Sequence, residues 1–297
     1  MRKKKRAIIF GANGQDGFYL NQLLSKFEIE VMNVSRTNAN ITGTVSSFSF
    51  VQKMIKENLP DYIFHFAARS STKHEFLFEN HETISTGTLN ILENVKLFSP
   101  LSRVFISGSA MQFKNSGVPI NENTAFEASS PYSIARIQSV YASRYYTNKF
   151  GLKIFVGFFF NHDSPRRTEQ HVNQKIVRAV QRIASGSNEK LVLGNIDVHK
   201  EFNYAGDIVD AVWKLVNQDE ISEAVIGSGK AYAIRDWVKY CFELKNLDWQ
   251  DHIVLQENYM PEYDLLVSDP VVIKSIGWKP KVDFNLLANM MMNANWK

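Results

Sequence analysis

A serine, a tyrosine and an arginine near the middle of the chain could together move a proton. Tyr132 and Arg136 are four residues apart, so on a helix they share one face. Ser109 ends an apolar run that reads as a strand. A cation beside a phenol favours the phenolate, and a serine hydroxyl can hydrogen-bond the same substrate oxygen. We therefore predict that Ser109, Tyr132 and Arg136 exchange a proton with a carbinol oxygen while hydride is exchanged with a nicotinamide.

A glycine-rich loop near the N-terminus predicts the cofactor. Gly11 permits a tight turn, Gly14 lets the backbone approach a pyrophosphate, and Gly17 allows a helix to pack closely on a strand. The N-terminus of that helix offers free N–H groups to phosphates. The predicted cofactor-binding residues of this loop are Gly11, Asn13, Gly14, Gln15, Asp16 and Gly17.

The end of the second expected strand distinguishes NAD from NADP. An acidic residue there would bind the ribose 2′-hydroxyl, whereas a basic residue accommodates a 2′-phosphate. The chain has Arg36 followed by Thr37, with no carboxylate. A guanidinium fork suits phosphate, although an arginine in a loop is also a common solvated residue. We predict that NADP(H) is preferred and that NAD(H) is possible.

Alternating strands and helices would place these groups. Expected strands cover residues 6–11, 30–35, 61–66, 102–107 and 152–158, and expected helices lie near 14–27, 47–56, 77–97, 131–150 and 172–183. This alternation, with nearly continuous apolar strands, is typical of a parallel sheet covered by helices on both faces. The prediction is an α/β, Rossmann-type doubly wound sheet over residues 1–160. Residues 161–297 would form mainly a smaller C-terminal substrate-binding lobe, with some segments returning to the core.

Composition limits the class of protein. The 297 residues are 44% hydrophobic, enough for a large core. The net charge is +4, but residues 2–6 carry five positive charges, so the remainder has a net charge of −1. This balance argues against a nucleic-acid partner. Cys241 is the single cysteine, the histidines lack metal-ligand spacing, and no run suggests a signal peptide or membrane span. We expect a cytoplasmic protein that holds no metal.

Several motifs resemble the extended short-chain dehydrogenase/reductases, and among them most closely the GDP-mannose 4,6-dehydratase family. The most specific is Asn-His-Asp-Ser-Pro-Arg-Arg at residues 161–167. The resemblance extends nearly end to end, through segments 11–20, 66–68, 130–136, 193–195 and 277–280. It implies a nucleotide-diphosphate sugar as substrate and a homo-oligomer, a dimer or tetramer, because the Arg166–Arg167 loop reaches a neighbouring subunit's cofactor in this family.

The resemblance also assigns residues to the two ligands. Those implied for the cofactor, beyond the glycine loop and Arg36, are Ala67, Ala68, Arg69, Tyr132, Arg136, Phe159, Asn161, His162 and Arg167. Those implied for the substrate are Asn161, Val172, Lys175, Gly194, Asn195, Lys200 and Glu262.

Five positions depart from the family pattern. The lysine that normally follows the tyrosine by four residues is Arg136, and arginine is not isosteric with lysine. A threonine and a glutamate two residues later are expected after the fourth strand. One alignment puts Ser109 and Met111 there, and the other puts Gly108 and Ala110, so neither supplies a carboxylate. Lys200 and Tyr259 stand where arginines are expected.

Three functions remain open from the sequence. The missing carboxylate favours reduction of a 4-keto nucleotide sugar, which needs only proton donation and hydride. The overall resemblance favours a 4,6-dehydratase. Arg136 together with the missing carboxylate also permits a catalytically impaired, dinucleotide-binding partner subunit.

Overall fold

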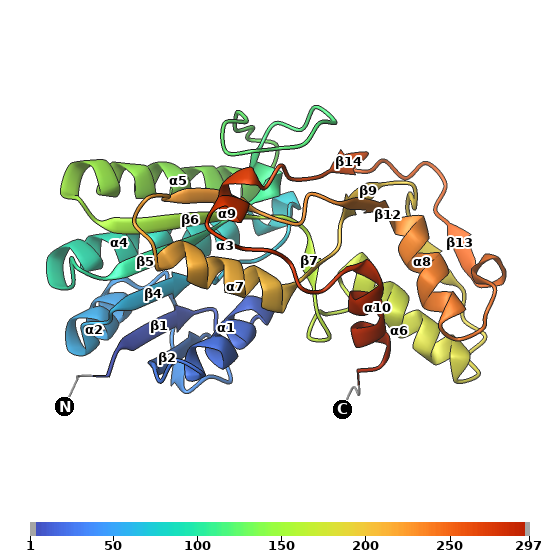
Figure 1. Cartoon of the computed structure of the whole chain (residues 1–297), viewed down its shortest axis with the longest axis horizontal. Helices are drawn as coiled ribbons and strands as arrows, with labels where there is room; N and C mark the ends of the chain where they lie inside the picture. Colours follow the sequence, from blue (N-terminus) through green and yellow to red (C-terminus); the bar gives the residue numbers. More distant parts are fainter. Residues whose placement is uncertain (1–3, 295–297) are drawn as a thin grey trace.

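A seven-stranded parallel sheet forms the centre of the computed structural model, which describes residues 4–294 (Figure 1). Arg2 and Lys3 of the basic N-terminal cluster lie outside the described residues. The strand order is β11-β6-β5-β4-β1-β2-β3. The strands are β1 (Arg6–Phe10), β2 (Glu30–Ser35), β3 (Ile41–Thr42), β4 (Tyr62–His65), β5 (Arg103–Ser109), β6 (Lys153–Phe159) and β11 (Glu223–Ile226). All of their pairings are parallel, which confirms the predicted doubly wound sheet.

Helices cover both faces of this sheet, and alternate residues of β1 show how. Ile8 and Phe10 pack into one core with α2 (Phe48–Asn58), α4 (Gly87–Phe98) and α5 (Pro131–Phe150). Ala7 and Ile9 point the other way. They pack into a second core with α1 (Gln15–Ser25), α7 (Ala205–Val216) and the short α9 (Val271–Ser275). Burial on both faces explains why the strands read as continuous apolar runs.

The helix expected near residues 77–97 is present, and it contains a π-helical turn that the sequence analysis did not predict. The structure has η1 (His74–Phe76), α3 (Leu77–Asn80), a π-helical turn η2 (His81–Thr86) and then α4. The buried Ser85 hydroxyl of η2 donates to the Ala135 carbonyl at 3.2 Å and to Gln138 Oε1 at 2.7 Å. This tertiary anchoring to α5 accompanies the wide turn. Turns of this kind occur frequently at functional sites.

A smaller lobe follows β6 and has its own core, which includes Trp237, Phe242 and Met291. Its elements are β7 (His162–Asp163), α6 (Val172–Ala184), β8 (Leu191–Leu193), β9 (His199–Glu201), β10 (Asn203–Tyr204), β12 (Ala231–Ala233), α8 (Ile234–Glu243), β13 (Ile253–Leu255), β14 (Leu265–Leu266) and α10 (Phe284–Met292). The chain leaves this lobe to add α7 and β11 to the main body (Figure 1). Cys241 is buried here, and burial raises the pKa of its thiol.

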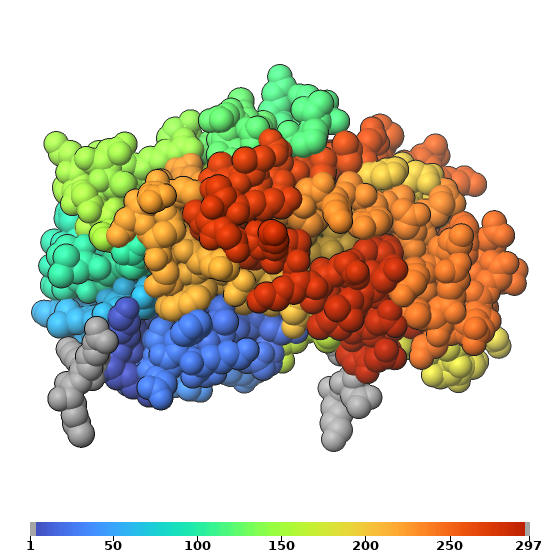
Figure 2. Space-filling model, in the orientation of Figure 1, coloured from blue at the N-terminus to red at the C-terminus, as the bar shows by residue number. Residues whose placement is uncertain are grey.

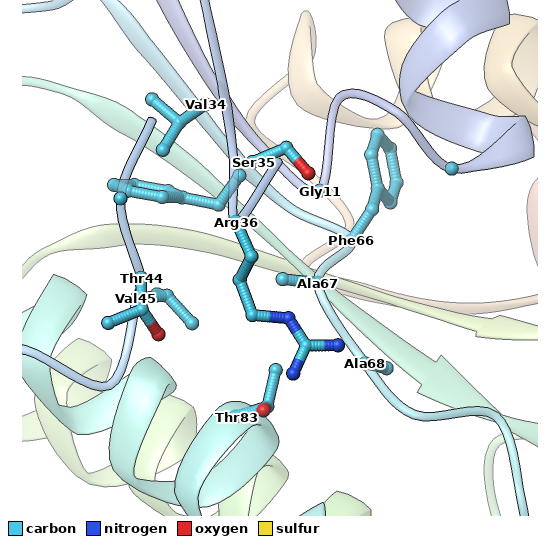
Figure 3. Close-up of a pocket in the computed structure, with 13 residues that line it drawn as sticks. Gly11, Val34, Ser35, Arg36, Thr44, Val45, Phe66, Ala67, Ala68 and Thr83 are labelled. Atoms are coloured by element: carbon cyan, nitrogen blue, oxygen red, sulfur yellow. The ribbon is translucent and has the colours of Figure 1, made fainter. Parts of the chain in front are cut away.

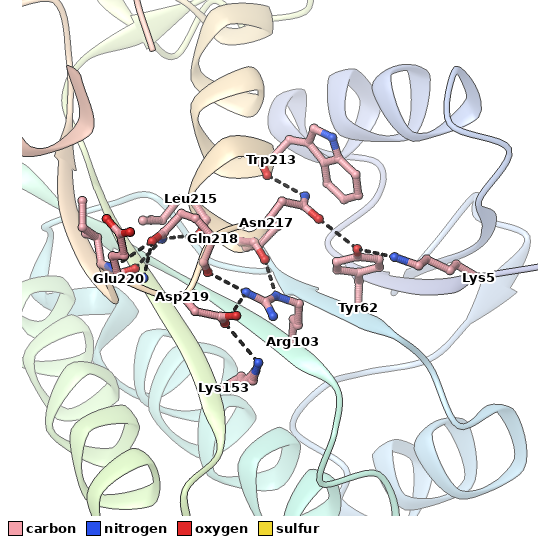
Figure 4. Close-up of polar contacts among 12 residues, drawn as sticks. Lys5, Tyr62, Arg103, Lys153, Trp213, Leu215, Asn217, Gln218, Asp219 and Glu220 are labelled. Carbon is pink, nitrogen blue, oxygen red and sulfur yellow. Dashed lines mark hydrogen bonds and ion pairs between the residues drawn. The ribbon is translucent and has the colours of Figure 1, made fainter. Parts of the chain in front are cut away.

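Polar contacts fasten the amino ends of the central strands to the connection between α7 and β11 (Figure 4). Arg103 at the start of β5 donates to the carbonyls of Val216 and Gln218 and to Asp219 Oδ1, the last at 2.7 Å. Lys153 at the start of β6 reaches the same Asp219 oxygen at 3.0 Å. This edge is therefore closed by its own chain, and the carboxyl ends of the strands remain to hold ligands. No helix within residues 4–294 has the length and hydropathy to cross a membrane.

Candidate active site

The glycine loop lies where the backbones of β1, α1 and the segment after β4 meet. Gly11 has a φ of +90°, and a Cβ there would lie 2.6 Å from the Ala67 nitrogen. A Cβ on Gly17 would lie 2.5 Å from the Gly11 carbonyl oxygen. Neither position can therefore carry a side chain without moving the backbone. The Asn13 amide donates to the Thr37 carbonyl and so joins the loop to the end of β2.

A cavity of about 160 Å³ opens beside this loop, at the carboxyl ends of β1, β2 and β4 (Figure 3). Its lining includes Gly11, Gly14, Ser35, Ala67, Ala68 and Thr83. Dinucleotides bind at this edge of such sheets, with the pyrophosphate at the helix N-terminus. Because glycines at 11, 14 and 17 leave room for a close backbone approach, these residues fit the adenosine and pyrophosphate part of a nicotinamide dinucleotide.

Arg36 lines the same cavity, as expected for a residue at the end of β2. Its side chain is 63% exposed, and its Nη1 lies 3.0 Å from Oε1 of Glu79 on α3. The guanidinium extends past Ala67 toward Ala68 and Thr83 (Figure 3). Arg36 can therefore bind a ligand only if its ion pair with Glu79 breaks, or if the guanidinium contacts Glu79 and the ligand at the same time.

Two residues of the loop contact the Asn-His-Asp-Ser-Pro-Arg-Arg segment. His162 Nε2 lies 2.9 Å from Asp16 Oδ1, and its Nδ1 lies 2.8 Å from the Phe160 carbonyl oxygen. Ser164 donates to Gln15 Oε1 at 2.7 Å. These contacts join α1 to the chain that leaves β6, so the dinucleotide loop and the most specific motif form one structure.

Charge governs the Asp16–His162 pair. Burial opposes ionisation of Asp16, but the charge and hydrogen bond of His162, aided by Arg167, leave the pKa of this carboxyl below its usual value. Burial also opposes the protonation of His162, yet the Asp16 carboxylate outweighs it and raises the pKa of the imidazole. The pair is thus an ion pair at mildly acidic pH.

The Tyr132–Arg136 pair lies at the start of α5. Ser130 caps this helix by accepting from the Ser133 N–H at 3.1 Å, and Pro131 is its first residue. The Arg136 guanidinium carbon lies 5.1 Å from the centre of the Tyr132 ring. Arg136 is 4% exposed. Its Nη1 donates to the Ser107 carbonyl and, at 2.8 Å, to the Ser107 hydroxyl.

Ser109 ends β5 and caps the short turn η3 (Ala110–Gln112). Its hydroxyl oxygen accepts from the Met111 N–H at 3.2 Å, which leaves its O–H available to donate. The apolar side chains packed around Tyr132 are Ala68, Ile84, Met111 and Ala135. The tyrosine is therefore bordered by a thioether at the position where one alignment expects a glutamate.

His65, at the end of β4, is a site residue that the sequence analysis left among scattered histidines. It is fully buried, and its carbonyl accepts from the Ser107 hydroxyl at 2.8 Å. Burial, together with the charge of Arg136, lowers the pKa of its imidazole to about 3. Its place directly before Phe66-Ala67-Ala68 was the available sequence signal. Glu79 and Ser107 were also missed, and nothing in their spacing indicates their partners.

A buried lysine lies on β9 of the smaller lobe. Lys200 is 6% exposed, and burial lowers the pKa of its amine to about 8 despite the opposing charge of Asp163. Asp163 also lies 3.4 Å from Arg167 Nε and accepts from the Asn173 amide at 2.6 Å. Asn161 holds β10 through its carbonyl, which accepts from the Asn203 amide at 2.9 Å. Asp163 is thus paired with Arg167, and its charge also acts on Lys200.

The remaining predicted residues lie around this centre. Lys175 donates to the Val192 carbonyl at 2.6 Å, close in sequence to Gly194. Asn195 Oδ1 accepts from the Asp197 N–H at 2.8 Å, and Glu262 accepts from the Thr72 hydroxyl. Val172 packs against the core of the smaller lobe.

Aromatic contacts hold two other predicted residues. The Phe159 ring lies 5.4 Å from the His162 ring, and the Arg69 guanidinium carbon lies 4.4 Å from the centre of the Phe76 ring. Within residues 4–294, no group of three or more His, Cys, Asp or Glu residues could hold a metal ion.

Comparison with known proteins places the chain. The family model for GDP-mannose 4,6 dehydratase matches residues 8–291. The chain belongs to this family. GDP-mannose 4,6 dehydratase 1 of Arabidopsis thaliana is 29% identical over 99% of this chain and 91% of that protein. The human GDP-mannose 4,6 dehydratase is 27% identical over 97% of this chain and 91% of that protein.

Solved structures share the fold of this family member. RMD from Pseudomonas aeruginosa complexed with NADPH has a TM-score of 0.86 at 19% identity, over 97% of this chain and 98% of that chain. dTDP-glucose 4,6-dehydratase from Bacillus anthracis, in complex with NAD, has a TM-score of 0.85 at 17% identity, over 97% and 95%. Family membership confirms the resemblance drawn from the motifs and the prediction of an NAD(P)-dependent nucleotide-sugar enzyme.

The Asp16–His162 pair predicts a pH-dependent stability. The lowered pKa of Asp16 stabilises the fold above the carboxyl's usual value, and the raised pKa of His162 stabilises it below the usual imidazole value. The contribution is therefore greatest between about pH 4 and 6.5. Asp16→Asn should lower the free energy of unfolding by about 1–3 kcal/mol at pH 5.5 and by less at pH 9, measured by urea unfolding.

Glu57→Gln, which removes an exposed carboxylate on α2, is the matched control and should change little at either pH. An equal loss for Asp16→Asn at both pH values would contradict the ion pair.

Proposed function

We propose that this chain reduces the 4-keto group of a nucleotide-diphosphate sugar with NADPH. The observation that carries the proposal is the composition of the surface around Tyr132. Met111, which stands where one alignment expects the family's glutamate, packs against the small apolar cluster that Tyr132 forms with Ile84 and Ala135. Reduction of a ketone needs one proton at one oxygen, and a tyrosine supplies it. NADPH, when bound, supplies the hydride.

The chain's own residues would position and protonate the ketone. Tyr132 would donate its phenolic proton to the carbonyl oxygen, and the free O–H of Ser109 would donate a hydrogen bond to the same oxygen. Arg136 would stabilise the resulting phenolate, because its charge is permanent and lies against the ring. Since Arg136 cannot itself give up a proton, the phenol would regain its proton from solvent water after the reduction, so that one hydride from NADPH and one solvent proton are consumed per ketone.

Cofactor choice follows from Arg36. Its guanidinium lies in the cavity at the end of β2, where a 2′-phosphate would be bound, and Ser35 supplies no carboxylate to bind a 2′-hydroxyl. Gly11, Asn13, Gly14, Gln15, Asp16 and Gly17 would hold the pyrophosphate side. The fold-level likeness to a protein solved with NADPH is compatible with this assignment.

The smaller lobe would hold the sugar nucleotide. Arg167 pairs with Asp163, and the same carboxylate exerts its charge on Lys200, so one negative charge faces two cations and positive charge would remain for a diphosphate. Lys175, Asn195 and Glu262 lie at the margins of the lobe, where a base and sugar would be bound. We also propose a homo-oligomer. Exposed apolar side chains on the outer faces of α4 and α5, such as Leu89, Tyr141 and Tyr145, support it.

A second candidate is nucleotide-sugar 4,6-dehydration, of the GDP-mannose type. The match to the GDP-mannose 4,6 dehydratase model over residues 8–291 favours it. Elimination needs a base for the C5 proton, and neither alignment supplies a carboxylate at the family's glutamate position. A third reading, an inactive partner subunit, rests on Arg136 in place of lysine.

One assay separates these functions. Purified protein should oxidise NADPH stoichiometrically with a 4-keto-6-deoxy sugar linked to GDP, UDP or dTDP, followed by the loss of nicotinamide absorbance. Nucleotide sugars with a 4-hydroxyl should not be dehydrated, which means that no keto sugar should form from them at an unchanged cofactor concentration. Formation of that product by the parent chain would establish dehydration instead, and no reaction with either set would favour the inactive subunit.

Met111→Glu should gain dehydration, whereas the isosteric Met111→Gln should not.

Substitutions of Tyr132 and Arg136 test the catalytic assignment. Tyr132→Phe removes the proton donor but keeps the ring, so turnover should fall by roughly 10²–10⁴. Cofactor affinity, measured by fluorescence titration, should change little. Arg136→Lys should retain or raise turnover, because a compact ammonium approaches the phenol more readily. Undiminished turnover in Tyr132→Phe would sink the catalytic assignment.

Substitution of Arg36 tests the predicted preference for NADPH. The affinity for NADPH should be at least about tenfold higher than that for NADH. Arg36→Gln should remove most of this difference by lowering the affinity for NADPH alone. Titration of both cofactors measures it. Lys73→Gln, which removes an exposed cation from the neighbouring loop, serves as the control. Equal affinities in the parent chain would refute the role of Arg36.

A further inference from the structure

Arg36, which lines the dinucleotide cavity, forms an ion pair with Glu79. Arg36 follows β2, and Glu79 belongs to α3. The Nη1–Oε1 distance is 3.0 Å. The pair is accessible, since the arginine side chain is 63% exposed and the glutamate 33%. A ligand arriving from solvent therefore meets both partners.

The direction of the arginine matters for what it can bind. Its guanidinium extends toward Ala68 and Thr83 and lies across the cavity (Figure 3). Glu79 is the acceptor that holds it there. A phosphate bound by this guanidinium would therefore lie within a few ångströms of a carboxylate.

We propose that Glu79 is a specificity-determining residue that narrows the preference of the site for NADPH over NADH. The inference rests on the proposed role of Arg36. A 2′-phosphate carries nearly two negative charges, so Glu79 repels it and competes with it for Arg36. A 2′-hydroxyl is neutral and donates to a carboxylate, which is how acidic residues select NAD in this type of fold. One carboxylate thus acts in opposite directions on the two cofactors.

The test is the ratio of two dissociation constants in Glu79→Gln. The amide keeps the shape of the side chain and removes its charge. NADPH should bind more tightly, NADH equally or more weakly, and the ratio of the NADH to the NADPH dissociation constant should rise by about fivefold or more. Adenosine 2′,5′-bisphosphate and AMP should show the same change, which locates it at the 2′ position. The rise should shrink at 0.5 M salt, because the charges are exposed.

Glu75→Gln is the matched control. Glu75 lies four residues earlier in η1, is exposed, and changes the net charge equally. A rise confined to Glu79→Gln supports the proposal. An unchanged ratio in that variant, or the same rise in both variants, overturns it.

Arg36→Gln distinguishes this inference from the proposed cofactor preference. If Arg36→Gln leaves NADPH affinity unchanged, the cofactor assignment fails and the inference fails with it. If Arg36→Gln weakens NADPH binding while Glu79→Gln leaves the ratio unchanged, only the inference fails. In the double variant, the gain from Glu79→Gln should be smaller than in the parent chain, because the competition for Arg36 no longer exists.

Discussion

Burial of a charge that cannot be neutralised is the constraint on which the centre of this structure depends. Arg136 stays protonated at any accessible pH, and a buried charge is costly unless it is well hydrogen-bonded. Its compensation comes from neutral groups, the Ser107 carbonyl and hydroxyl and the face of the Tyr132 ring. Because the Ser107 hydroxyl in turn donates to the His65 carbonyl, one guanidinium joins α5 to β5 and β4. The same contacts set the position of the tyrosine.

That charge also determines the state of its neighbour. The imidazole of His65 is buried, and Arg136 adds like-charge repulsion to the cost of desolvation, so the pKa of His65 falls to about 3. A neutral ring here leaves the guanidinium as the only positive charge beneath Tyr132 among these residues. An arginine in place of lysine therefore changes more than one side chain, because the groups around it must supply neutral acceptors.

Local signals in the sequence predicted the elements that have clear ends. Ser130 and Pro131 mark the start of α5, and Gly151, with a φ of +67°, marks its end, so this helix agrees with the prediction. The dinucleotide loop was equally predictable, since the local backbone geometry requires glycine at its key positions. The helical stretch expected over residues 77–97 is present, but the π-helical turn within it, whose Ser85 hydroxyl bonds to α5, was not predicted. The spacing of apolar residues over 77–97 does not indicate this contact with a distant helix.

Pairings between distant segments were beyond the reach of motif spacing. Asp16 and His162 were each predicted to bind the cofactor, but their mutual contact joins segments that are far apart in the chain. Glu79 became meaningful only when α3 was placed against the end of β2. The lowered pKa of the Lys200 amine depends on its burial in the folded lobe, which composition does not show. What the sequence could not predict is how independent motifs neutralise or oppose one another.

The arrangement of carboxylates bears directly on the reaction. Elimination across C5 and C6 requires a base at C5 in addition to the group that exchanges a proton at O4. The buried Glu201 is held by Ser228, Ser268 and Asn203, and Glu122 accepts from the Val225 N–H. Both carboxylates are committed to structural hydrogen bonds.

The proposed reduction needs no base at C5. Met111 packs against the apolar cluster that contains Tyr132 and stands where one alignment expects the family's glutamate. Because hydride addition to a ketone needs one proton at one oxygen, the proposed reaction requires only a hydride donor and the single phenol.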